Sequence, residues 1–112
     1  MILNVPCYNE SVGGGFGDAH PERRDPSRPL WLNELLQEVA TAHPNVVKLL
    51  DLHSYLCPTG KYQANLDGVR LHRDGMHYTD EGAALVWKWL GPQLKAIALP
   101  SPATTTKTTL AR

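Results

Sequence analysis

Apolar residues of this chain gather in four runs, separated by stretches rich in glycine, proline and charged residues. The first run, Ile2–Pro6, is short and ends at a proline, which predicts a brief strand. The second run predicts an amphipathic helix over residues 29–43, with Ser27 as candidate N-cap and His43-Pro44 as its end. Its apolar positions recur at helical spacing: Leu32, Leu35, Leu36 and Val39, with Trp31 beside them.

The third run, Val46–Leu52, is almost continuously apolar, as expected of a strand buried on both faces of a parallel sheet. The fourth predicts a helix from about residue 80, which Gly91-Pro92 kinks or splits. Its apolar stripe comprises Leu85, Val86, Trp89, Leu90, Leu94 and Ile97. Strand, helix and strand in this order form a βαβ unit. The predicted class is therefore α/β, with two or more parallel strands flanked by two principal helices.

The segments between these runs carry little periodicity. Residues 8–29 form a long loop whose Gly13–Gly17 run lacks the Gly-Lys-Ser/Thr ending of a P-loop, so a hinge or lid is favoured over a phosphate cradle. Residues 53–72 are a second irregular region, in which short extended pieces cannot be placed. The Thr-rich end, residues 100–112, predicts a disordered tail behind a domain of residues 1–99.

Charge and length exclude several classes of partner. Eleven Lys and Arg residues balance eleven Asp and Glu residues, and no basic strip is long enough to follow a phosphate backbone. No apolar run approaches the ~20 residues of a membrane span, and the N-terminus lacks the basic and apolar regions of a signal peptide. We expect no nucleic-acid partner and no membrane span. Because the sequence opens inside a predicted strand, we also expect either a mis-set start or a missing front half.

Candidate chemistry concentrates in the block from Arg73 to Gly82. Asp74 and His77 stand three residues apart in a turn that contains glycine, and Thr79 can cap the helix that follows. Such a turn lifts an imidazole above a scaffold and lets a carboxylate fix its tautomer, so the other ring nitrogen can take a proton. We interpret Asp74 as the orienting acid and His77 as the general base of an acyl-transfer site.

Other interpretations of the same residues carry less support. Asp74 and His77 alone also fit an ordinary surface turn, and His72 is a rival base that we interpret as a rim or solvated histidine. A metal site of His72, Asp74 and His77 has no His-Glu-x-x-His or paired-cysteine motif behind it. Cys7 ends a strand, as a nucleophile can, but nothing nearby would lower the pKa of its thiol. The serines Ser11 and Ser54 lack a Gly-x-Ser-x-Gly elbow.

Cys7 and Cys57 are the two cysteines of the chain, and each follows a predicted strand. Strand ends at one sheet edge can lie close enough for a disulfide, whose long loop would stabilise the fold by a few kcal/mol. Two free thiols in a reducing compartment are the alternative. No secretion signal decides between them, so both interpretations stay open.

With this order of elements the chain resembles the C-terminal half of an SGNH/GDSL-type hydrolase domain, in the variety appended to membrane acyltransferases that O-acylate cell-surface glycans. The resemblance covers roughly residues 1–97, and its most specific part is Asp-Gly-x-His-aromatic-Thr at residues 74–79. The softer matches are Val5-Pro6-Cys7, Leu32-Asn33 with His43-Pro44, Val47 to Leu52, Leu56-Cys57-Pro58, Gly82 and Trp89-Leu90.

The resemblance implies a three-layer α/β/α, flavodoxin-like fold, here partial and without its N-terminal strands. It implies a serine nucleophile from a Gly-Asp-Ser block, with His77 as base and Asp74 as its partner. It also places Cys7 where the family has a disulfide. The chain departs from the pattern because Gly17-Asp18-Ala19 has alanine in place of serine, and no Gly-x-Asn-Asp block is found.

The resemblance therefore predicts part of an esterase or O-acyltransferase domain, without a cofactor and nearly inert by itself. The expected substrate is a small acyl ester or an acylated glycan, and the expected partner is the missing N-terminal half. The location would be the extracytoplasmic side of a membrane. The competing hypothesis is a truncated or degenerate α/β domain that serves only as an interaction surface.

Overall fold

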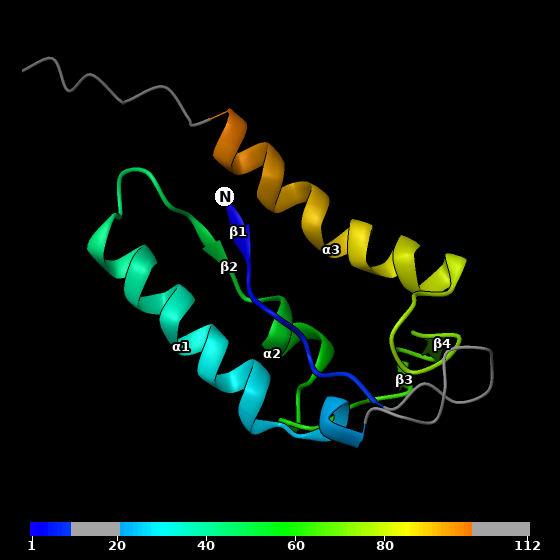
Figure 1. Cartoon of the computed structure of the whole chain (residues 1–112). Helices are drawn as coiled ribbons and strands as arrows, with labels where there is room; N and C mark the ends of the chain where they lie inside the picture. Colours follow the sequence, from blue (N-terminus) through cyan, green and yellow to red (C-terminus); the bar gives the residue numbers. More distant parts are fainter. Residues whose placement is uncertain (10–20, 100–112) are drawn as a thin grey trace, which may run out of the picture.

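The computed structural model describes residues 1–9 and 21–99 (Figure 1). Strand β1 (Ile2–Leu3) and strand β2 (Leu49–Leu50) pair in parallel, with Ile2 opposite Leu49 and Leu3 opposite Leu50. Helix α1 (Ser27–Ala42) lies between them in the chain, and in Figure 1 it and helix α3 (Asp80–Ala98) flank the strands from opposite sides. The predicted α/β class with parallel strands and two principal helices is confirmed.

Helix α1 begins two residues before the predicted start. Ser27 is its first residue rather than its cap, because both the backbone N–H and the hydroxyl of Ser27 donate to Asp25 Oδ1, at 2.9 and 2.7 Å. A short 3-10 helix, η1 (Pro21–Arg24), precedes this turn. At the other end the predicted stop at His43-Pro44 agrees with the structure, in which His43 is the C-cap.

The buried face of α1 differs from the predicted stripe. Leu32, Leu35 and Val39 stay 39, 38 and 44 % exposed, whereas Ala40 is buried. The side chain of Asn33, a polar residue within the helix, turns inward. It accepts from Val5 N at 2.7 Å and donates to Val5 O at 2.8 Å. Because one amide satisfies both backbone groups of Val5, the helix is rotated so that part of its apolar stripe faces outward.

Both predicted strands are longer than the observed ones. The last backbone bond of the ladder runs from Asn4 N to Leu50 O at 3.1 Å. Side-chain bonds follow it, since Asn4 Nδ2 donates to Asp51 Oδ1 and His53 N donates to Asn4 Oδ1, both at 2.7 Å. The prediction that Val46–Leu52 forms one strand buried on both faces is wrong. Val46 is 81 % exposed, and Leu52 opens helix α2 (Leu52–Leu56), which Asp51 caps.

The second irregular region contains regular elements. Helix α2 is followed by a hairpin of β3 (Asn65–Leu66) and β4 (Val69–Arg70). Asp67 and Gly68, at the turn between them, have φ of 51° and 77°, the left-handed conformation that two-residue hairpin loops require. The dipeptide Asp67-Gly68 was thus the sequence signal for this hairpin. Strand β4 leads directly into the loop that carries Asp74 and His77.

Helix α3 is continuous over Asp80–Ala98, so Gly91-Pro92 does not split it. Its inner face packs on a buried cluster formed by Cys7, Leu52, Leu56, Cys57 and Leu71. Trp89 is half-buried, as its place on the stripe predicts, and stacks on Tyr55 with ring centroids 5.0 Å apart. Trp87, off the stripe, is exposed.

Cys7 and Cys57 are joined by a disulfide inside this cluster, which ties the end of the first segment to the end of α2. The Gly13–Gly17 run, Ser11 and the Thr-rich tail lie outside the described residues.

Two glycines of α3 make a matched test of this packing. A Cβ at Gly82 would collide with the backbone carbonyl of Leu71, whereas a Cβ at Gly91 meets nothing. We expect Gly82→Ala to lower the free energy of unfolding by roughly 1–3 kcal/mol through overpacking. Gly91→Ala should leave it unchanged or raise it by up to ~1 kcal/mol, because alanine favours helix. Urea unfolding followed by circular dichroism measures both, and equal effects would contradict the close approach.

Candidate functional site

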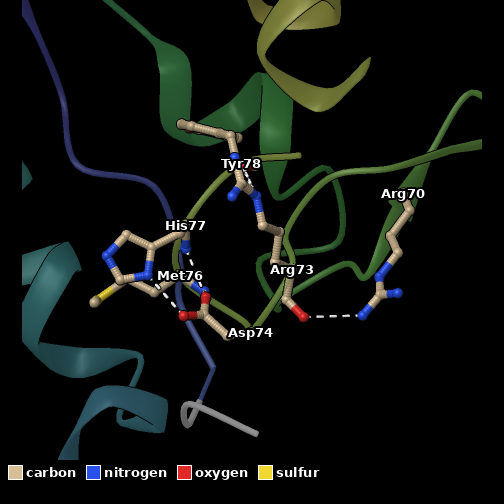
Figure 2. A network of polar contacts seen from close by, with 6 residues as sticks. All are labelled: Arg70, Arg73, Asp74, Met76, His77 and Tyr78. Atoms are coloured by element: carbon tan, nitrogen blue, oxygen red, sulfur yellow. Dashed lines mark hydrogen bonds and ion pairs between the residues drawn. The ribbon is translucent and has the colours of Figure 1, made fainter. Parts of the chain in front are cut away.

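The turn that carries Asp74 and His77 is a closed loop that directly follows strand β4. An isolated bridge pairs His72 with Tyr78, and Arg73 N donates to His77 O at 2.8 Å. Gly75 has φ of 87°, a backbone conformation that residues other than glycine rarely adopt. The loop therefore reverses direction within a few residues, and Figure 2 shows the imidazole of His77 beside the carboxylate of Asp74.

The carboxylate of Asp74 organises this loop with both of its oxygens. Oδ1 accepts from the backbone N–H of Met76 and of His77, at 3.0 and 2.8 Å. Oδ2 lies 2.6 Å from Nδ1 of the His77 ring, and Figure 2 shows these contacts as dashed lines. The hydrogen bond from the His77 side chain, followed by that from its backbone, holds the pKa of Asp74 well below its usual range. An ionised carboxylate only accepts, so Nδ1 of His77 carries a proton.

The other nitrogen of the His77 ring, Nε2, is not engaged by Asp74. The side chain of His77 is 68 % exposed, against 24 % for Asp74. With Nδ1 committed to Asp74, a neutral ring offers the lone pair of Nε2 as a proton acceptor. Within residues 1–9 and 21–99 no hydrogen bond engages Nε2. The structure thus brings Asp74 and His77 together in the geometry that the spacing predicts.

Backbone contacts fix this loop to the scaffold. Thr79 N donates to Leu71 O at 3.0 Å, and its hydroxyl donates to Arg70 O at 2.5 Å while accepting from Gly82 N at 2.8 Å. Thr79 is therefore both the N-cap that the sequence predicts and a clamp between β4 and α3.

Two arginines that sequence reasoning leaves unassigned brace the loop (Figure 2). Arg70 donates to the carbonyls of His72 and Arg73, at 3.1 and 2.9 Å, and Arg73 donates to that of Tyr78 at 3.0 Å. Arg73 also lies 3.6 Å from Asp80, an exposed pair of little energetic weight. Their position shortly before Asp74 was the available signal.

The interpretation of His72 as a rim or solvated histidine is wrong, because the residue is only 3 % exposed. Its ring stacks on Tyr78 at 4.9 Å between centroids and contacts Tyr62 and Tyr8 at 5.6 and 6.4 Å. Neither ring nitrogen has a hydrogen-bond partner among the residues that the structure describes. Burial lowers the pKa of His72, and the charge of Asp74 opposes that shift in part. Burial likewise raises the pKa of Tyr78 to about 12, so the cluster is uncharged near neutral pH.

The alternative nucleophiles and the metal site gain no support. Both cysteines are in the disulfide, so Cys7 offers no thiol. Ser54 lies exposed on α2. Among the described residues, no group of three or more His, Cys, Asp and Glu side chains could hold a metal ion. No helix in this part of the chain is long and apolar enough to cross a membrane.

The sequence was compared with models of known protein families. The family model of the SGNH domain, described as fused to AT3 domains, matches residues 20–90. The chain belongs to this family. The matched segment spans α1, β2 and the loop with Asp74 and His77, and it supports a domain of the hydrolase or acyl-transfer type. Comparison with curated proteins and with solved structures finds no match.

The ionised, hydrogen-bonded carboxylate of Asp74 should make the stability of the domain depend on pH in the acid range. Because the pKa of Asp74 is depressed in the folded state, its contribution is complete above the unfolded value of ~3.9 and is lost as pH falls below it. We expect Asp74→Asn to cost roughly 1 kcal/mol at pH 7, with a gap that shrinks below pH ~4. Asp67→Asn, in the hairpin turn, is the control. A gap independent of pH in urea unfolding would contradict the ionised pair.

The buried ring of His72 predicts a second pH dependence. A histidine with a lowered folded pKa contributes stability that is present above the unfolded value of ~6.5 and lost as pH falls below it. His72→Phe should keep the ring stack, match or exceed the wild type at pH 8 and abolish this loss. Thermal unfolding between pH 8 and 5 measures it, with the exposed His43→Gln as control. Parallel profiles for wild type and His72→Phe would show that His72 does not titrate as a buried group.

Proposed function

We propose that this chain supplies the Asp-x-x-His part of a serine esterase or O-acyl-transfer site. The supporting observation is the 2.6 Å contact between Asp74 Oδ2 and Nδ1 of an otherwise exposed His77. In the proposed reaction a serine hydroxyl gives its proton to Nε2 of His77, and its oxygen attacks the carbonyl carbon of an acyl ester. Asp74 stabilises the imidazolium, which then protonates the leaving alcohol. Water or a sugar hydroxyl completes the transfer by attacking the acyl-enzyme.

The nucleophile in this proposal comes from a Gly-Asp-Ser block outside residues 1–112. Residues 1–99 then form the C-terminal portion of the domain, and its N-terminal half is the partner. The apolar side chains of Leu32, Leu35 and Val39 on α1 support this part, because an exposed apolar stripe of a helix is normally covered in a complete domain. The substrate is a small acyl ester or an acylated glycan, encountered on the extracytoplasmic side of a membrane.

A non-catalytic interaction domain is the second candidate. Its specific support is the absence of a Gly-Asp-Ser block from the sequence, where Gly17-Asp18-Ala19 carries alanine instead of serine. A base without a nucleophile cannot form the acyl-enzyme, so such a chain would be retained for its surface alone. A complete domain assembled with the upstream block separates the two candidates.

His77→Ala is the decisive substitution in a polypeptide where a Gly-Asp-Ser block precedes this chain. We expect turnover of p-nitrophenyl acetate to fall by ~10²–10⁴-fold, because general-base assistance is lost. The exposed His43→Ala at the end of α1 should keep the wild-type rate. The 112-residue chain alone should stay near the uncatalysed rate.

Equal rates for the wild type and His77→Ala would remove His77 from the mechanism. A fluorophosphonate probe supplies an independent readout, since it labels an activated serine without any need for the natural ester. If the longer polypeptide is neither labelled nor active, the non-catalytic candidate is favoured.

A further inference from the structure

A cavity of about 370 Å³ opens where three segments meet: residues 7–9 after β1, the η1–α1 junction, and residues 60–62 after α2. Its volume lies in the range of ~300–1,000 Å³ typical of small-molecule sites. None of its lining residues belongs to the Asp74–His77 pair, so the function proposed above leaves it unexplained.

Two tyrosines give the cavity aromatic walls. Tyr8 and Tyr62 both line it, and both rings also contact the buried ring of His72. Burial raises the pKa of each phenol, so both hydroxyls stay protonated and can donate hydrogen bonds. A half-buried aromatic ring with a polar tip suits a ligand with one apolar face and a rim of hydroxyls, as a pyranose has.

Of the described residues that line the cavity, two are basic and one is acidic. Arg24 and Lys61 line it together with one carboxylate, that of Asp25. Asp25 already accepts two hydrogen bonds from Ser27, which lower the pKa of that carboxyl group. Lys61 is exposed and makes no hydrogen bond or ion pair within the described parts of the chain. Its ammonium group is therefore available to a carboxylate on the ligand.

The cavity is tied to the catalytic loop by the backbone. Asn9 lines it, and Asn9 N donates at 3.0 Å to the carbonyl oxygen of Gly75, the residue that follows Asp74. A ligand in the cavity would thus lie beside the loop that carries Asp74 and His77.

From these four features we infer that the cavity binds an acidic pyranose, of the uronic-acid class, within a glycan substrate. The ring would lie against Tyr8 and Tyr62, and its carboxylate would meet Lys61. The role of this subsite in acyl transfer rests on the function proposed above, whereas binding itself does not. Lys61 then selects acidic over neutral sugars without touching the reacting atoms.

The test uses the 112-residue chain and D-glucuronate as probe, with amide chemical shifts and calorimetry as readouts. We expect shifts at residues 7–9 and 60–62, and about tenfold weaker binding by Lys61→Gln, the loss expected for one charge-assisted hydrogen bond. Lys88→Gln, an exposed lysine on α3, should bind as the wild type does. D-Glucose should bind more weakly than D-glucuronate, and acetate, which has the charge but no ring, more weakly still.

Several outcomes would overturn the inference. These are equal affinity of the wild type and Lys61→Gln, acetate binding as tight as that of D-glucuronate, and shifts confined to other segments. His77→Ala separates this inference from the proposed function, because it should keep D-glucuronate binding while esterase activity of the longer polypeptide is lost. Activity that depends on His77 without any sugar binding would overturn the subsite alone. Binding without such dependence would overturn the catalytic proposal alone.

Discussion

The junction between β4 and α3 is the constraint on which the site depends, and Thr79 makes it. One residue closes hydrogen bonds there to Arg70, Leu71 and Gly82, so the strand end and the helix start cannot move apart independently. This close junction requires glycine at position 82, because a Cβ there would collide with the carbonyl of Leu71. The loop from His72 to Tyr78 is thereby anchored at both ends, and an exposed imidazole acquires a fixed position.

Within the anchored loop, backbone contacts contribute more order than charge does. An exposed histidine–carboxylate pair alone is worth ~0–1 kcal/mol and would not hold two side chains in one geometry. Asp74 does not depend on this pair alone, because its Oδ1 accepts hydrogen bonds from two backbone N–H groups of the same loop, those of Met76 and His77. The carboxylate is therefore positioned before it meets the ring. Such preorganisation would serve the proposed role of His77, because a general base has to keep its orientation while it takes up and releases a proton.

Elements with strong local signals were predictable from the sequence, and elements set by side-chain pairing were not. The α/β class, the end of α1 at His43-Pro44, the start of α3 at Thr79 and the proximity of Asp74 and His77 all follow from periodicity, capping residues and short spacing. The strand ends and the facing of α1 depend instead on Asn4, Asn33 and Asp51, whose amide and carboxylate groups replace backbone pairing. No local pattern reveals such long-range partners, since they lie 28 to 47 residues apart.

His72 shows the same limit in its strongest form. A histidine next to a charged loop is normally solvated, and its burial follows only from three tyrosines that come from separate segments, Tyr8, Tyr62 and Tyr78. The ring of His72 therefore lies between the loop that carries Asp74 and His77 and the wall of the cavity. Through the bridge to Tyr78 it supports the loop with Asp74 and His77, and through Tyr8 and Tyr62 it backs the wall of the cavity. Among the described residues neither nitrogen of this ring has a hydrogen-bond partner, so His72 joins the loop to the cavity wall through ring packing alone. Close packing of this kind leaves the three tyrosines little freedom to move independently of the loop.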